Sequence, residues 1–157
     1  MSFAIGAEVQ VSEEESAIIL EHFESLIGDI DAIGIFSHNT LIALPMFIPG
    51  FGAAWGFFSA YSTGFAFAAL KTGTPELISL NPLLLLLTPF GMMELAAYSI
   101  AMSRSVLFIE RIIKKTSIFA EKKVILIEIG IVVGLLLVGG IIEMWMIEIA
   151  QGMEGIA

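Results

Sequence analysis

Apolar positions dominate the chain and come in long blocks separated by short polar segments. No Asp, Glu, Lys or Arg occurs from residue 32 to residue 70, and Glu94 is the single charged residue from 77 to 103. The block from 124 to 150 contains three glutamates and no base. Because a helix needs about 20 mostly apolar residues to cross the bilayer core, the pattern predicts an all-α membrane protein built as a polytopic helical bundle.

The lengths of these blocks predict about four transmembrane helices. One helix over residues 32–70 would be about 58 Å long, and the sequence FIPGFG at 47–52 provides a break. The first span is short and contains Pro45, so we expect it to be kinked or only partly inserted. The third span is expected to be broken near Pro89. The expected spans are residues 32–48, 52–70, 82–102 and 124–147.

An amphipathic helix is expected before the first span, over residues 12–30. Ser12 and Glu15 have the spacing of a capping box, and apolar residues recur on one side at helical spacing: Ile19, Phe23, Leu26, Ile27 and Ile30. We therefore divide the chain into an acidic amphipathic helix at 1–31 and a transmembrane domain at 32–157. The first 31 residues hold eight of the 16 acids and no base, so this helix should dock on protein rather than on anionic lipid.

Composition and charge sharpen this picture. The chain is 57% hydrophobic with a mean hydropathy of +0.94 and a net charge of −9. It has no cysteine, its N-terminus does not read as a signal peptide, and its acidity argues against binding nucleic acid. Six of the seven bases lie in a connector at 103–123, which the positive-inside rule places in the cytoplasm. We expect a multi-pass protein of the cell membrane, with both termini outside if there are four spans.

Small residues recur at every fourth position of the expected second span: Gly52, Gly56, Ala60, Gly64 and Ala68. This spacing places them on one helix face, and small side chains let two helices approach closely in lipid. The face predicts either an oligomer interface or packing against the chain's own third or fourth span. Gly130 and Gly134 in the last span form a shorter face of the same kind.

The residues TPFGMMELAAYSIA at 88–101 place a helix-breaking pair, Pro89 and Gly91, close to the charged Glu94. An acid at mid-span must be paired, hydrated or protonated. Glu94 is therefore a proton or ion site, an anchor of a polar network between helices, or a residue nearer the membrane surface. We expect the network, with Asn39 as a buried partner and His38 as a further member or as a residue in contact with water.

The other ionisable groups have ordinary explanations. Glu128 lies close to the basic connector, so ionic contact with Arg104, Lys122 or Lys123 is expected. No combination of nucleophile, base and acid is present, nor a phosphate loop or a metal motif. The sequence therefore predicts neither an enzyme nor a cofactor or metal site.

Several of these features together resemble the stage II sporulation protein M family of integral membrane proteins. The resemblance covers roughly residues 33–103. It consists of Asn39, the glycine-rich span with Gly52 and Gly56, Thr63-Gly64, and the element formed by Pro89, Gly91 and Glu94. Phe90 and Thr63 stand where the family usually has His and Asn. The resemblance implies a multi-span, non-enzymatic membrane component.

These observations predict a membrane scaffold or an assembly component of a membrane complex. The expected partners are the lipid bilayer, a second copy of the chain in a homo-oligomer, most simply a dimer, and other membrane or surface proteins. The alternative is a small transporter or channel that uses Glu94, because interrupted helices often line substrate sites.

Overall fold

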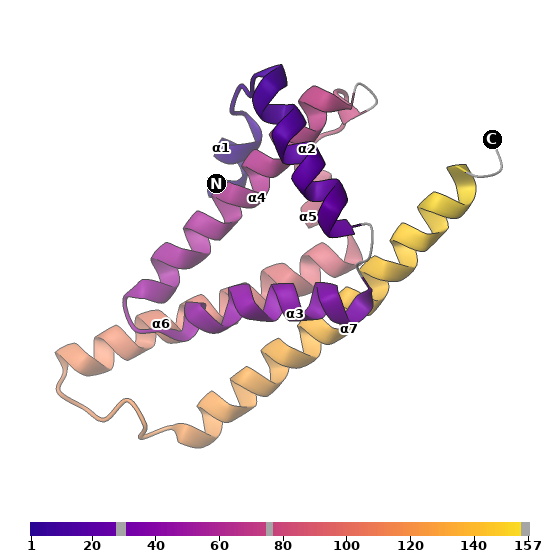
Figure 1. Cartoon of the computed structure of the whole chain (residues 1–157). Coiled ribbons are helices and arrows are strands. Elements are labelled where there is room, and N and C mark those ends of the chain that lie inside the picture. Colours follow the sequence, from indigo (N-terminus) through magenta and orange to yellow (C-terminus); the bar gives the residue numbers. More distant parts are fainter. Residues whose placement is uncertain (28–30, 75–76, 155–157) are drawn as a thin grey trace. The chain divides into compact units, whose positions relative to one another are not determined.

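The computed structural model describes residues 1–27, 31–74 and 77–154 (Figure 1). These residues form helices joined by turns, with no strand among them, which confirms the predicted all-α class. The helices are α1 (Ser2–Ala7), α2 (Glu13–Ile27), α3 (Ala32–Ala43), the 3₁₀ helix η1 (Leu44–Phe47), α4 (Phe51–Gly73), α5 (Leu83–Leu86), α6 (Pro89–Ile113) and α7 (Lys122–Glu154). They make two compact units, residues 1–30 with 57–87 and residues 31–56 with 88–157.

The first unit contains the acidic helix α2, whose predicted capping box is confirmed. The Glu15 backbone N–H donates to Ser12 Oγ and the Ser12 backbone N–H donates to Glu15 Oε2, each at 3.2 Å. The Ser12 hydroxyl also donates to Glu15 Oε2, at 2.8 Å. The hydrogen bonds from Ser12 lower the pKa of Glu15 below its ordinary value. One turn on, the buried Ser16 hydroxyl donates to the Ala69 carbonyl at 2.8 Å and joins α2 to α4. The last residues of the predicted helix, 28–30, lie outside the described residues.

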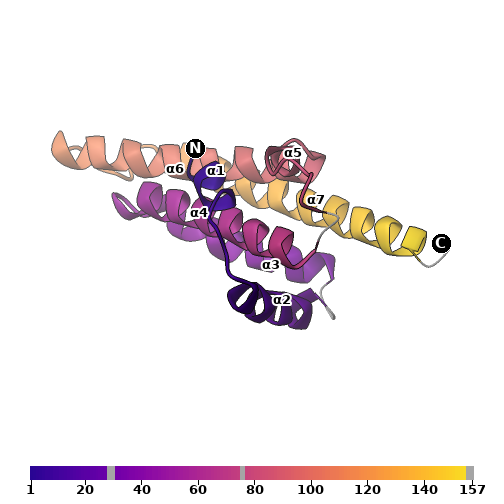
Figure 2. The ribbon, with the colours of Figure 1, turned by 90° about the horizontal axis from the view of Figure 1, so that it is seen from above.

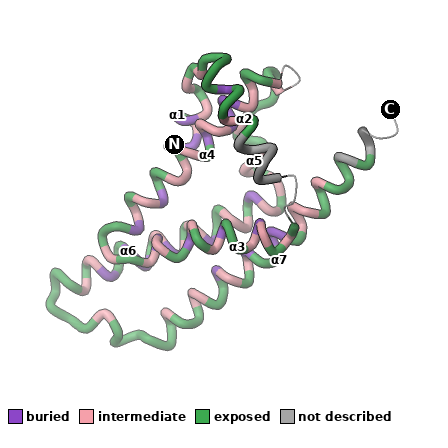
Figure 3. Tube along the Cα trace, in the orientation of Figure 1, coloured by how far each residue is buried: buried purple, intermediate pink, exposed green. Residues whose placement is uncertain are grey.

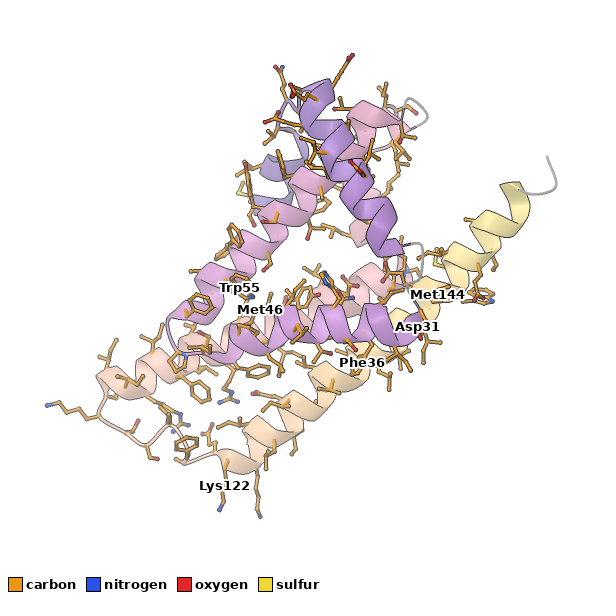
Figure 4. The ribbon with its side chains drawn as sticks, viewed as in Figure 1. Asp31, Phe36, Met46, Trp55, Lys122 and Met144 are labelled. Atoms are coloured by element: carbon orange, nitrogen blue, oxygen red, sulfur yellow. The ribbon has the colours of Figure 1, made fainter. Side chains whose placement is uncertain are left out.

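The second unit is a bundle of α3, η1, α6 and α7 together with the first turns of α4. Helices α6 and α7 pack along each other and are joined by a turn, and α3 packs on both of them (Figures 1 and 2). The interior is made of small and branched side chains that are almost fully buried: Ala43, Ala97, Val132 and Leu136. Phe36, labelled in Figure 4, packs against this cluster from α3. Most of the outer surface of α7 is exposed (Figure 3).

Two of the described helices are long and apolar enough to cross a membrane, over Pro89–Ile113 and Lys122–Ala150. The four predicted spans are therefore not confirmed as a set. The first corresponds to a shorter apolar segment, Ala32–Phe47. The second falls within α4, whose glycine and hydroxyl side chains lower its hydropathy. The coarser expectation, a helical protein with membrane-crossing candidates, matches the structure.

The predicted break in the third span is not confirmed, because Pro89 begins a helix instead of interrupting one. Thr88 is the N-cap of α6, and its hydroxyl oxygen accepts the Gly91 N–H at 3.1 Å. Proline suits the first position of a helix, where its missing N–H costs no hydrogen bond. Helix α6 then continues to Ile113. Roughly half of the expected 103–123 connector is consequently helical.

Candidate functional site

Asn39 and Glu94 form the polar centre of the second unit. Asn39 is 8% exposed on α3, and its Nδ2 donates to Glu94 Oε1 on α6 at 2.7 Å. Both positions face the interior of the bundle, since Ala43 and Ala97, one turn further along each helix, belong to the core. The hydrogen bond joins residues 55 positions apart in sequence. It supplies a donor to the one acid in the middle of the apolar block.

Further polar groups lie near this pair. Tyr98 follows Glu94 by one turn of α6, and Glu143 on α7 is within electrostatic range of both residues. Glu143 Oε2 and Thr40 Oγ1 are buried without a hydrogen-bond partner among the described residues. A buried polar oxygen without a partner costs free energy. The site therefore holds two carboxyl groups. Glu94 accepts a hydrogen bond from Asn39, whereas Glu143 Oε2 has no hydrogen-bond partner among the described residues.

Two adjacent glycines bring α7 close to its neighbours beside this site. A Cβ at Gly140 would lie 3.2 Å from the Ala32 carbonyl oxygen of α3, and one at Gly139 would lie 3.7 Å from Met93 Cβ of α6. The distance at Gly139 is ordinary van der Waals contact, whereas the one at Gly140 is tight, so a larger residue at Gly140 would push α7 away from α3. The glycines thus set the spacing at which α7 presents Glu143 to the bundle.

His38, expected either as a further member of the polar network or as a residue in contact with water, is not part of the network. Its side chain is exposed, and in the described part of the chain no hydrogen bond joins it to Glu94. Successive residues on a helix point about 100° apart, so a helix that turns Asn39 inward turns His38 away. The polar network consists of Asn39 and Glu94, with Tyr98 and Glu143 nearby.

The small-residue face on α4 is covered by the chain's own segments in both units. In the second unit, a Cβ at Gly52 would overlap the Met46 carbonyl of η1, and one at Gly56 would overlap the Met102 side chain of α6. Met46 and the neighbouring Trp55 are labelled in Figure 4. The Trp55 indole N–H donates to the Ile42 carbonyl at 3.0 Å. Helix α6 was one of the two intramolecular partners predicted for this face.

In the first unit the partner of the same face is α1, which the sequence did not indicate. A Cβ at Gly64 would overlap the Phe3 carbonyl, and one at Gly6 would overlap the Tyr61 carbonyl. Ala68 is 5% exposed and Ala60 is half-buried. The contact is reciprocal: Gly64 of α4 packs against the backbone of α1, and Gly6 of α1 packs against the backbone of α4. Gly6 was the available signal, but a six-residue apolar segment is too short for periodicity to reveal.

A second polar centre lies near the turn between α6 and α7. Arg104 is 3% exposed and donates from Nε and Nη2 to the two carboxylate oxygens of Glu128, each at 2.5 Å. Its Nη1 lies 3.5 Å from Glu121, which also pairs with Arg111. The expected ionic contact of Glu128 is confirmed, with Arg104 as the partner. The burial of Arg104 was not predicted, because this residue falls in the expected connector at 103–123.

No group of three or more metal-ligating side chains occurs within the described residues. A comparison of the chain with protein families, with curated proteins and with solved structures finds no match. The resemblance to the stage II sporulation protein M family therefore stays a prediction.

Proposed function

We propose that the chain is an integral membrane scaffold or assembly component, related in kind to stage II sporulation protein M, that works through its helices rather than by catalysis. Its two long apolar helices support insertion in a bilayer. We include α3 with η1 and α4 as further spans in a four-span arrangement, the first of them only partly inserted. The basic segment at 103–123, which contains the turn between α6 and α7, then faces the cytoplasm.

The observation that carries this proposal is the hydrogen bond from Asn39 to Glu94. Lipid tails are as apolar as the side chains of the helices, so burying these side chains between helices contributes little free energy. Helices in lipid therefore associate through close packing and interhelical hydrogen bonds. The pair ties α3 to α6 beside a tightly packed cluster. An acid used in this way has a structural role and needs no substrate.

The test has two stages. Carbonate extraction of source membranes should leave the chain in the membrane fraction, and its recovery in the soluble fraction would end the proposal. Glu94→Gln should then preserve the oligomeric state and the partners captured by cross-linking. Loss of those partners from a folded Glu94→Gln variant would contradict a purely structural role.

Self-association is part of the proposal, and α7 is the helix best suited to it. The face of α4 is already occupied, whereas a Cβ at Gly130 or Gly134 would meet nothing within 4 Å. Both glycines are exposed, next to exposed Leu126 and Ile131. Gly134→Leu should dissociate a dimer in detergent. Gly56→Leu should lower stability without changing the oligomeric state. The reverse result would return the interface to α4.

A second candidate function is transport by a small channel or carrier. It is favoured by Glu143, whose buried Oε2 has no hydrogen-bond partner among the described residues and which interacts electrostatically with Glu94. Two carboxylates in one bundle could pass a proton. This alternative predicts pH-dependent proton flux in proteoliposomes that Glu94→Gln abolishes. Wild-type protein that carries no flux, or a Glu94→Gln variant with unchanged flux, would exclude it.

A further inference from the structure

The turn between α6 and α7 and the first residues of α7 carry three lysines that take no part in the ion pairs near them. Arg104 and Arg111 are held by Glu121 and Glu128, and Lys114 pairs with Glu110. Lys115, Lys122 and Lys123 are exposed and have no ion pair among the described residues. Figure 4 shows the Lys122 side chain extending away from the ribbon where α7 begins. The turn is exposed over nearly its whole length (Figure 3).

Lys115 occupies a backbone position that favours glycine. Helix α6 ends with the Thr116 N–H donating to the Arg111 carbonyl at 2.9 Å and the Lys115 N–H to the Ile112 carbonyl at 3.0 Å. This is the pattern of a Schellman motif, in which the left-handed residue is usually glycine. Lys115 adopts that conformation with a φ of +54°. A lysine here is a poorer choice for ending the helix than glycine would be.

Lys122 and Lys123 are also poorly placed for the stability of their own helix. They are the first two residues of α7, and no acid occurs in its first turn. The N-terminus of a helix carries the positive end of the macrodipole, so cations there are unfavourable. Lys115, Lys122 and Lys123 thus each contradict a local rule of helix stability. Residues that do so without a compensating contact are candidates for a functional role.

Large apolar side chains stand exposed among these bases. Ile113 is 73% exposed and Phe119 is 70% exposed, and Val124 is also exposed. Bases interleaved with exposed apolar side chains suit the boundary between lipid headgroups and acyl chains. A free phosphate would give Ile113 and Phe119 nothing to contact.

We propose that a turn surface, formed by Ile113, Lys115, Phe119, Lys122, Lys123 and Val124, binds the headgroups of anionic phospholipids. The lysines contact the lipid phosphates while the apolar side chains enter the boundary with the acyl chains. The ion pairs of Arg104 and Arg111 hold the end of α6 and the start of α7 together, while the three lysines stay exposed. This inference rests on the proposed membrane insertion of α6 and α7.

The test compares lipid adducts on the full chain, purified in neutral detergent, by native mass spectrometry. Phosphatidylglycerol should bind more tightly than phosphatidylcholine and should weaken as salt is raised. Each basic residue near an anionic surface contributes about fivefold in affinity. Lys115→Gln/Lys122→Gln/Lys123→Gln should therefore lose roughly a hundredfold. The matched triple Lys→Arg variant should retain binding.

The melting temperature is a second measurement, because substituting lysines with a merely structural role would lower it. Lys115→Gly and Lys122→Gln/Lys123→Gln should melt at the wild-type temperature or above it while binding less phosphatidylglycerol. If these variants melt lower and keep their lipid, the lysines are structural and the inference is wrong. Equal binding of the two lipids, or displacement of phosphatidylglycerol by millimolar inorganic phosphate, would also overturn it. Carbonate extraction tests insertion separately: a chain that stays in the membrane without preferring phosphatidylglycerol refutes this inference alone.

Discussion

The coupling between Asn39 and Glu94 can be measured with two substitutions and their combination. Asn39→Leu keeps a side chain of similar size and removes the amide that donates to Glu94 Oε1 at 2.7 Å. Glu94→Gln keeps an oxygen that can accept this hydrogen bond and removes the ionisable carboxyl group. The double variant then reports how much of the cost of losing Asn39 depends on the charge of Glu94.

The expected magnitude follows from burial. A hydrogen bond to a charged group is worth about 1.5–3 kcal/mol in proteins, whereas interhelical hydrogen bonds in membranes average about 0.6 kcal/mol. Asn39 is 8% exposed and Glu94 is half-buried, so we expect the cost of losing the donor to lie between these two values. We expect Asn39→Leu to cost about 1.5 kcal/mol in the wild-type background and about 0.5 kcal/mol in Glu94→Gln. Glu94→Gln alone should change stability by less than about 0.5 kcal/mol.

The assay is unfolding in mixed micelles with increasing dodecyl sulfate, followed by tryptophan fluorescence and by the helical circular dichroism signal. His38→Leu is the matched control, since it alters an exposed neighbour on α3 and should change the free energy of unfolding by less than about 0.5 kcal/mol. Costs of Asn39→Leu that agree within about 0.3 kcal/mol in the two backgrounds would show that the pair is not energetically coupled. The Asn39–Glu94 contact would then not be what joins α3 to α6.

Three further predictions use the same apparatus. Arg104→Met should cost about 3 kcal/mol, because it leaves the Glu128 carboxylate unpaired, and Arg104→Met/Glu128→Met should recover most of that loss. Gly52→Ala places a methyl group against the backbone of η1 and should cost about 1–3 kcal/mol, whereas Gly130→Ala should be neutral within about 0.5 kcal/mol. The pKa of Glu15 is lowered from 4.5 by its capping hydrogen bonds, so their stabilisation is present above about pH 4.5 and is lost as the pH falls through the folded pKa. Glu15→Gln should remove this part of the acid sensitivity of the first unit, measured by circular dichroism between about pH 5 and 3.

The fold class and the main polar positions could be predicted from single-helix patterns. Charge-free blocks long enough to cross a bilayer indicate helices, and the Ser12–Glu15 spacing specifies a helix start because the two groups bond within one turn. Glu94 could be singled out because an acid in an apolar block needs a hydrogen-bond donor. Asn39 was the expected partner because its side-chain amide can donate such a bond between helices. The start of α6 at Pro89 could also have been predicted, because a threonine followed by a proline is typical of a helix N-terminus. The apolar residues on both sides favoured a single broken span instead.

What the sequence determined on its own was therefore the content of each helix face, and what the tertiary structure decided was which faces meet. A period of 3.6 residues establishes that Gly52, Gly56 and Gly64 share one side of α4, but it does not specify the partner. The structure covers that side with η1 and α6 in one unit and with α1 in the other, and it leaves Gly130 and Gly134 of α7 open. The same holds for Arg104, whose burial depends on the register of α6 against α7. That register is set by close packing over the whole length of two helices, a sum of many small contacts that no local pattern records.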